Sequence, residues 1–212
     1  MNAKARSPKR CAMAVWTDCA AADEAQFNEW YNRQHLTQRV AVPGFLNGAR
    51  YVAVSGRPKY FAIYGWANAR VGPSPVYMHL QDHPTRWTAA MMRAFRGTNR
   101  TVFDVRCRLG NGRGALAACI WLTPAPDREA ALERVLAGSL LPRLYAEAGL
   151  TGVTLLCVNR KASRMDSNES RMRAGPDRLA DWVILVEGAD RASVTSACAR
   201  HATPAQLERA GA

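Results

Sequence analysis

The stretch 27–45 constrains the fold more than any other part of the chain. Phe27, Tyr31 and His35 follow one another at intervals of four residues, the spacing that brings side chains onto one face of a helix. That face joins apolar bulk to a phenol and an imidazole, which is more typical of a pocket wall than of a plain core. The Pro-Gly pair at 43–44 is expected to end the helix, and the residues after it have the pattern of a strand.

Hydrophobic periodicity predicts two successive sets of elements with the order βαββαβ, the second incomplete. The first set comprises strands at 10–17, 45–54, 60–66 and 101–109 and helices at 22–40 and 75–95, the latter broken at Pro84. The second set comprises strands at 115–122, 153–159 and 182–186 and helices at 127–148 and 191–201. Residues 203–212 have little β character, so the last strand of the second set is not expected.

These elements predict an α+β chain with two tandem repeats. We expect a disordered tail at 1–9, a first repeat at 10–110, a glycine-rich linker at 111–114 and a degenerate second repeat at 115–212. Within the second repeat, the polar segment 164–178 lies where a hairpin should be. We interpret it as an exposed loop, with the added hypothesis that it covers a pocket.

Composition restricts the classes of partner. The net charge is +12, but 25 of the 29 basic residues are arginines spread along the chain, and no basic block alternates with aromatic residues, so nucleic-acid binding is disfavoured. No apolar run approaches the roughly 20 residues of a membrane-spanning helix, and the amino terminus lacks a signal-peptide pattern. We therefore expect a soluble cytoplasmic protein that binds a small-molecule substrate and does not bind a membrane. The sequence also allows a homodimer.

The stretch described first resembles the EthD-like branch of the dimeric α+β barrel (ferredoxin-like) superfamily, in which a Trp-Tyr-Asn-x-Glu-His-Leu helix leads to a Pro-Gly-Phe strand. The residues in register are Glu29, Trp30, Tyr31, Asn32, His35, Leu36, Arg39, Pro43, Gly44 and Phe45. One residue departs from the pattern, because Gln34 stands where the family usually has glutamate. The resemblance implies that both repeats are ferredoxin-like, with their sheets packed as an intramolecular dimeric α+β barrel.

The resemblance also implies a cofactor-independent lyase, isomerase or monooxygenase that acts by proton transfer on a polyketide-like, quinonoid or lactone substrate. His35 would move the proton, Tyr31 would orient it or a substrate oxygen, and Arg39 would offset negative charge. The residues assigned to substrate binding are Phe27, Asn32, Trp87 and Phe95, with Trp87 and Phe95 on a second amphipathic helix. The competing interpretation is structural: His35 is a satisfied core histidine, Tyr31 is packing, and Arg39 is a solvated helix-end charge.

No metal and no cofactor are expected. His79 and His83 share a helical spacing but lack a third ligand, and the glycines of 110–114 lack the lysine of a phosphate-binding loop. The alternative to an enzyme is a non-catalytic module that binds a hydrophobic acid or haem, with His35 as the axial ligand, or that mediates assembly.

Overall fold

The computed structural model describes residues 10–212, which form two compact units. The first unit contains the described residues up to Asp104 together with Asn159–Leu179, and the second contains Val105–Val158 together with Ala180–Ala212. The chain therefore leaves the first unit, forms most of the second, and returns to the first before finishing the second.

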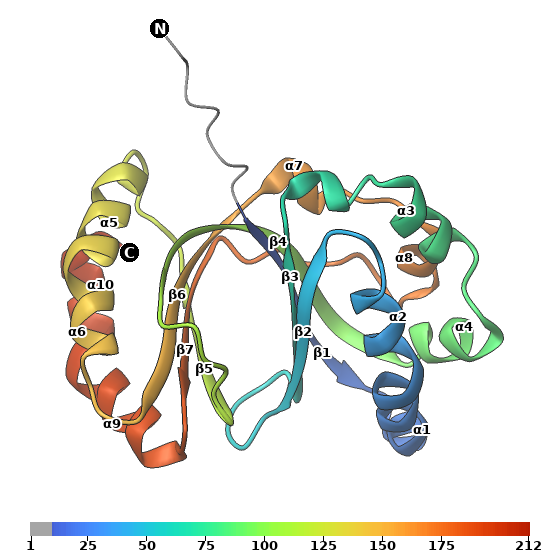
Figure 1. The fold of residues 1–212 in the computed structure, drawn as a ribbon, viewed down its shortest axis with the longest axis horizontal. Coiled ribbons are helices and arrows are strands. Elements are labelled where there is room, and N and C mark those ends of the chain that lie inside the picture. The colour runs from blue at the N-terminus through green and yellow to red at the C-terminus, as the bar shows by residue number, and fades with distance from the viewer. Residues whose placement is uncertain (1–9) are drawn as a thin grey trace, which may run out of the picture. The chain divides into compact units, whose positions relative to one another are not determined.

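The first unit is an antiparallel sheet with helices along one face (Figure 1). Its strand order is β2-β3-β1-β4, and the central strand β1 pairs antiparallel with both β3 and β4. The strands are β1 (Cys11–Cys19), β2 (Phe45–Val52), β3 (Tyr60–Trp66) and β4 (Phe95–Leu109), whose last residues belong to the second unit. The helices are α1 (Glu24–Trp30), α2 (Leu36–Val40), α3 (Pro75–Asp82), α4 (Arg86–Met92), α7 (Arg160–Ser163) and α8 (Asn168–Met172), with short 3-10 turns at Ala21–Asp23 and Ala69–Val71.

The helix predicted over 22–40 is present, with one feature that the sequence pattern did not indicate. A π turn, Tyr31–His35, joins α1 to α2, and the N–H of Leu36 donates to the carbonyl of Tyr31 five residues earlier. Turns of this kind are rare and occur frequently at functional sites.

The predicted helix stop at the Pro-Gly pair is also present. Gly44 has a φ of +95°, and a Cβ at this position would lie 2.6 Å from a methyl carbon of Val71. Only glycine therefore fits the turn that leads into β2.

The second unit also combines a sheet with helices. Its strand order is the carboxyl-terminal part of β4, then β6, β7 and β5, again with helices along one face. Its elements are β5 (Leu116–Leu122), α5 (Glu129–Val135), a π turn (Leu136–Leu140), α6 (Leu141–Tyr145), β6 (Leu150–Val158), β7 (Trp182–Gly188), α9 (Arg191–His201) and α10 (Pro204–Ala210).

The first elements of the two units begin at a constant interval along the chain. The starts of β1 and β5 (Cys11, Leu116), of α1 and α5 (Glu24, Glu129), of the π turns (Tyr31, Leu136) and of β2 and β6 (Phe45, Leu150) are each 105 residues apart. Both β2 and β6 also shift register against their neighbour just after their first residue. The correspondence allows each position of the first helix to be compared with its counterpart in the second unit.

Several expectations need correction. The units meet within β4 at Asp104, so the linker 111–114 lies inside the second unit and does not separate them. The segment 164–178 belongs to the first unit and is not an exposed loop, because it contains α8 and contributes Met165 and Met172 to the packing of that unit's core. We call residues 159–179 the insertion.

At the chain ends, residues 204–210 form α10 in place of the missing strand. The tail predicted at 1–9 lies outside the described residues. Within residues 10–212, no helix is both long and apolar enough to cross a membrane.

Candidate functional site

A cavity of about 30 Å³ lies in the first unit between the sheet and the helices. Met13, Val15 and Phe95 contribute apolar wall. The polar part of the lining includes the side chains of Tyr31, His35, Arg39, Gln81, Arg100, Glu169 and Arg173. A volume of this size accommodates about one water molecule or one oxygen-bearing group. It does not accommodate a whole polycyclic substrate.

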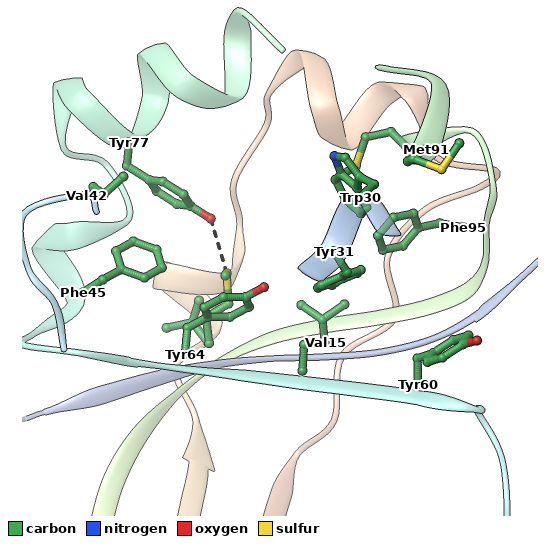
Figure 2. Packing of buried hydrophobic residues seen from close by; sticks show 14 of the residues in the cluster. Val15, Trp30, Tyr31, Val42, Phe45, Tyr60, Tyr64, Tyr77, Met91 and Phe95 are labelled. Atoms are coloured by element: carbon green, nitrogen blue, oxygen red, sulfur yellow. Dashed lines mark hydrogen bonds between the residues drawn. The ribbon is translucent and has the colours of Figure 1, made fainter. Parts of the chain in front are cut away.

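The predicted stripe of the first helix forms part of this cavity. His35 is 6% exposed, and its ring lies 4.1 Å from that of Trp30 and 4.9 Å from that of Tyr31, measured between centroids. Figure 2 shows Tyr31 between Trp30 and Val15 among the buried side chains of the first unit. The imidazole and the phenol are thus presented together to a sheltered space.

Arg39 carries a buried positive charge that is balanced by the insertion. One of its terminal nitrogens, Nη2, donates to both carboxylate oxygens of Glu169 on α8. The side chains of Arg39 and Glu169 are only 2% and 7% exposed. Burial acts to lower the pKa of Arg39, but the adjacent carboxylate holds that pKa above its ordinary value. Arg39 is therefore not the solvated helix-end charge of the structural interpretation.

Burial favours the uncharged forms of two side chains of the stripe, His35 and Tyr31. Burial, followed by the positive charges of Arg39, Arg173 and Arg50, holds the pKa of His35 well below its ordinary value. Burial likewise raises the pKa of Tyr31. The cavity therefore combines an uncharged imidazole and an uncharged phenol with fixed arginine charges.

Three buried side-chain nitrogen atoms of the cavity residues have no hydrogen-bond partner within the protein. They are Nδ1 of His35, Nη1 of Arg39 and Nε2 of Gln81, on side chains that line the same small space. Leaving a buried polar group unsatisfied costs about 1–3 kcal/mol, and such groups are rare in folded proteins. Their gathering in one cavity indicates a place prepared for a polar ligand.

The substrate-binding residues expected from the sequence have mixed outcomes. Phe95 lines the cavity, although it begins β4 and does not lie on the second helix. Phe27 is fully buried among aromatic rings, and Trp87 is half-buried, but neither is among the cavity-lining residues. Asn32 is exposed on the outer face of the helix and is not among the cavity-lining residues.

The cavity residues that were not predicted from the sequence include Gln81, Arg100, Glu169 and Arg173. Glu169 and Arg173 lie in the insertion, which the sequence pattern assigned to the other repeat. No periodic signal in a polar segment indicates which side chains become buried.

The second unit has no polar counterpart of the stripe. At an interval of 105 residues, Tyr31, His35 and Arg39 correspond to Leu136, Leu140 and Leu144. The three leucines are buried in the apolar core of their unit, with exposures of 0%, 8% and 0%. A helix with the same π turn thus packs on its sheet with leucine alone, and the fold itself does not require the polar residues of the first unit.

In the part of the chain that the structure describes, there is no fitting site for a metal ion or for haem ligated by His35. Among residues 10–212, no group of three or more His, Cys, Asp or Glu side chains is arranged to hold a metal ion. His79 and His83 are exposed and stack on each other with ring centroids 4.2 Å apart. The cavity beside His35 is far too small for a porphyrin, so the residues present do not fit haem as an axially ligated group.

The lowered pKa of His35 predicts that the stability of the folded protein depends on pH. The unfolded chain binds a proton at His35 below about pH 6.5, whereas the folded chain does not, so stability falls as the pH falls below that value, by up to about 1.4 kcal/mol per pH unit. We expect His35→Leu to remove this part of the dependence. Urea unfolding of both proteins between pH 7.5 and 5 measures the effect, and equal slopes would contradict it.

Comparison with known proteins shows the fold. No family model matches the chain, and no curated protein matches it in sequence. An anthrone oxidase-like protein has a TM-score of 0.64 at 11% identity, over 97% of this chain and 82% of that one. A candidate monooxygenase from Fusobacterium nucleatum has a TM-score of 0.59 at 10% identity, over 95% and 84%. A major regulator of staphylococcal pathogenesis has a TM-score of 0.50 at 11% identity, over 94% and 90%.

At such identities, the likeness concerns architecture and leaves activity open. The chain therefore shares its α+β fold with these solved structures.

Proposed function

We propose that the first unit is the active unit of a cofactor-independent, EthD-like enzyme that transfers a proton at a carbon next to a carbonyl group. The reaction class is isomerase or lyase, and the substrates are polyketide-like, quinonoid or lactone compounds. The supporting observation is the contrast between the two units: buried Tyr31, His35 and Arg39 stand where the matching helix has leucines. Buried polar residues that the fold does not need are best explained by chemistry.

In this proposal Nδ1 of His35 accepts the proton as the carbon–hydrogen bond breaks. The electron pair of that bond moves onto the carbonyl oxygen, which becomes an enolate. Nη1 of Arg39 and the hydroxyl of Tyr31 donate hydrogen bonds to the enolate oxygen, where negative charge develops. The imidazolium then returns the proton to the same carbon, to another carbon of the enolate, or to a leaving group.

The environment of His35 suits the return of the proton. The imidazolium is destabilised by burial and by three nearby guanidinium groups, so it persists only beside the enolate that it has generated. His35, once protonated, therefore returns the proton to the enolate rapidly and does not keep it. This is the behaviour required for isomerisation or hydrogen exchange, in which no proton is lost from the site overall.

We also propose that the units are diverged copies of one ancestral repeat, and that only the first kept a site. The constant interval of 105 residues and the paired π turns support this history. The second copy has become an apolar support, and the insertion supplies the first copy with Glu169.

Hydrogen exchange tests the function. The wild-type protein is incubated in D₂O with anthrone, 2-tetralone and a γ-lactone, and incorporated deuterium is measured by mass spectrometry. Anthrone is included because one structural neighbour has an anthrone oxidase-like name. We expect exchange above the buffer rate with at least one compound. No excess exchange with any of them would count against a proton-transfer enzyme of this substrate class.

Tyr31→Phe removes one hydroxyl from the cavity without changing the ring. Losing one hydrogen bond of about 1–1.5 kcal/mol should slow exchange about tenfold. Tyr145→Phe, a change at a 40%-exposed tyrosine of the second unit, is the control and should leave the rate unchanged. Equal rates for Tyr31→Phe and the wild type would remove Tyr31 from the mechanism.

The second candidate is a binding module for a hydrophobic acid, favoured by the same unsatisfied donors and by the cavity's arginines. It predicts ligand binding without exchange. The homodimer left open by the sequence stays a prediction, which sedimentation measurements can test.

A further inference from the structure

A second, larger hollow lies within the insertion. It has a volume of about 460 Å³ and is lined by residues between Ser163 and Leu179. Its apolar lining includes Met165, Pro176 and Leu179, and Leu179 is 39% exposed. We call this hollow the groove.

Two side-chain contacts join the cavity residues directly to the groove residues. Arg173 lines the cavity, and its Nε donates to Oδ1 of Asp177, a groove residue, at 2.9 Å. Arg100 also lines the cavity, and its Nη2 lies 3.3 Å from the sulfur of Met165 in the groove. Two side-chain contacts therefore connect the lining of the cavity to that of the groove.

The two volumes complement each other. The cavity holds one small group, whereas the groove lies within the 300–1,000 Å³ that is typical of ligand pockets. A ligand with a small polar end and a larger body would occupy both. The polar end would meet the unsatisfied nitrogens of Arg39 and Gln81.

The charges of the cavity indicate the nature of that end. Arg39 is paired with Glu169 and Arg173 with Asp177, so that the three arginines of the lining leave an excess positive charge at Arg100. A positive, mostly buried lining with unsatisfied N–H groups favours an anionic oxygen over a neutral one. The groove's sulfur and aliphatic surfaces suit a flat apolar body.

We propose that the groove binds the body of a flat aromatic acid or acidic phenol, whose oxygen-bearing end passes between Arg100 and Arg173 into the cavity. This assignment rests on the proposed function, because it defines the substrate class of the same site. The acidic group is held by Gln81 and the arginines, and the ring system lies against Met165 and Leu179.

Calorimetric titration with 2-naphthoate tests the proposal, with methyl 2-naphthoate as the uncharged ligand of nearly the same shape. We expect the wild-type protein to bind the acid at least tenfold more tightly than the ester. Leu179→Trp fills the groove from a partly exposed position and should weaken binding of the acid at least tenfold. Val76→Trp, on a 56%-exposed valine of α3, is the matched control and should bind like the wild type.

A second variant examines the cavity end of the ligand. Gln81→Leu removes an amide that makes no hydrogen bond through Nε2 and should weaken binding of the acid about tenfold, without changing that of the ester. The proposal is overturned if acid and ester bind alike, if Leu179→Trp binds like Val76→Trp, or if Gln81→Leu leaves the affinity for the acid unchanged. Binding that follows these expectations without hydrogen exchange would refute only the enzymatic function, whereas exchange that is insensitive to Leu179→Trp would refute only the groove.

Discussion

Glu169→Gln is expected to lower the free energy of unfolding by about 3–5 kcal/mol. The substitution keeps the shape of the side chain but leaves the guanidinium of Arg39, 2% exposed, without its counter-charge. A buried charge without a partner destabilises the folded protein far more than the intact ion pair stabilises it. Chemical denaturation of the purified variant measures the loss, together with the expected loosening of α8.

Two comparisons separate this effect from a general loss of surface charge. Glu29→Gln breaks the exposed pair with Arg33, whose side chains are 56% and 72% exposed, and should cost less than about 1 kcal/mol. Arg39→Leu combined with Glu169→Leu removes both charges and should be more stable than Glu169→Gln alone. A loss below about 1 kcal/mol for Glu169→Gln would mean that Arg39 finds another partner.

His35→Leu is expected to slow hydrogen exchange by about a hundredfold to ten-thousandfold, the usual contribution of general acid-base catalysis. The same change should keep or raise stability, because it replaces an imidazole with an unsatisfied Nδ1 by the residue found at the matching position of the second unit, Leu140. Loss of activity with gain of stability is the expected behaviour of a buried functional residue.

The control for His35→Leu is Leu140→Met, a change of similar volume at the corresponding position, which should alter neither exchange nor stability by much. Exchange and unfolding are measured on the same preparations. If His35→Leu exchanges within a few-fold of the wild type, roughly less than one order of magnitude, His35 is not the proton carrier. If it unfolds more readily than the wild type, the imidazole has a structural role.

The fold was largely predictable because its signals are local. Apolar spacing indicated the first helix, and the Pro-Gly pair at 43–44 indicated where it ends, at a glycine that the structure shows to have a positive φ. The π turn Tyr31–His35 was not predictable, since one extra residue in a turn leaves the side-chain stripe almost unchanged. Asn32 was assigned to substrate binding because it belongs to the family pattern. The assignment did not consider the face of the helix, on which Asn32 is exposed.

The site was predictable only where it depends on one helix. Tyr31, His35 and Arg39 were found by their spacing, and the structure places all three at the cavity. Glu169 is 130 residues from Arg39 in sequence, in a polar segment without periodicity, so nothing local indicates that the two meet. The insertion was interpreted as an exposed loop because polar composition alone does not reveal a buried carboxylate.

The discontinuous path of the chain has a consequence for biosynthesis. Chains emerge from the ribosome amino terminus first, and domains tend to fold as they emerge. The first unit is complete only when Leu179 has been made, after β5 and β6 of the second unit. A nascent or truncated chain ending near residue 110 would hold Arg39 without its counter-ion, so the early half is expected to remain a client of chaperones until the later half has been translated.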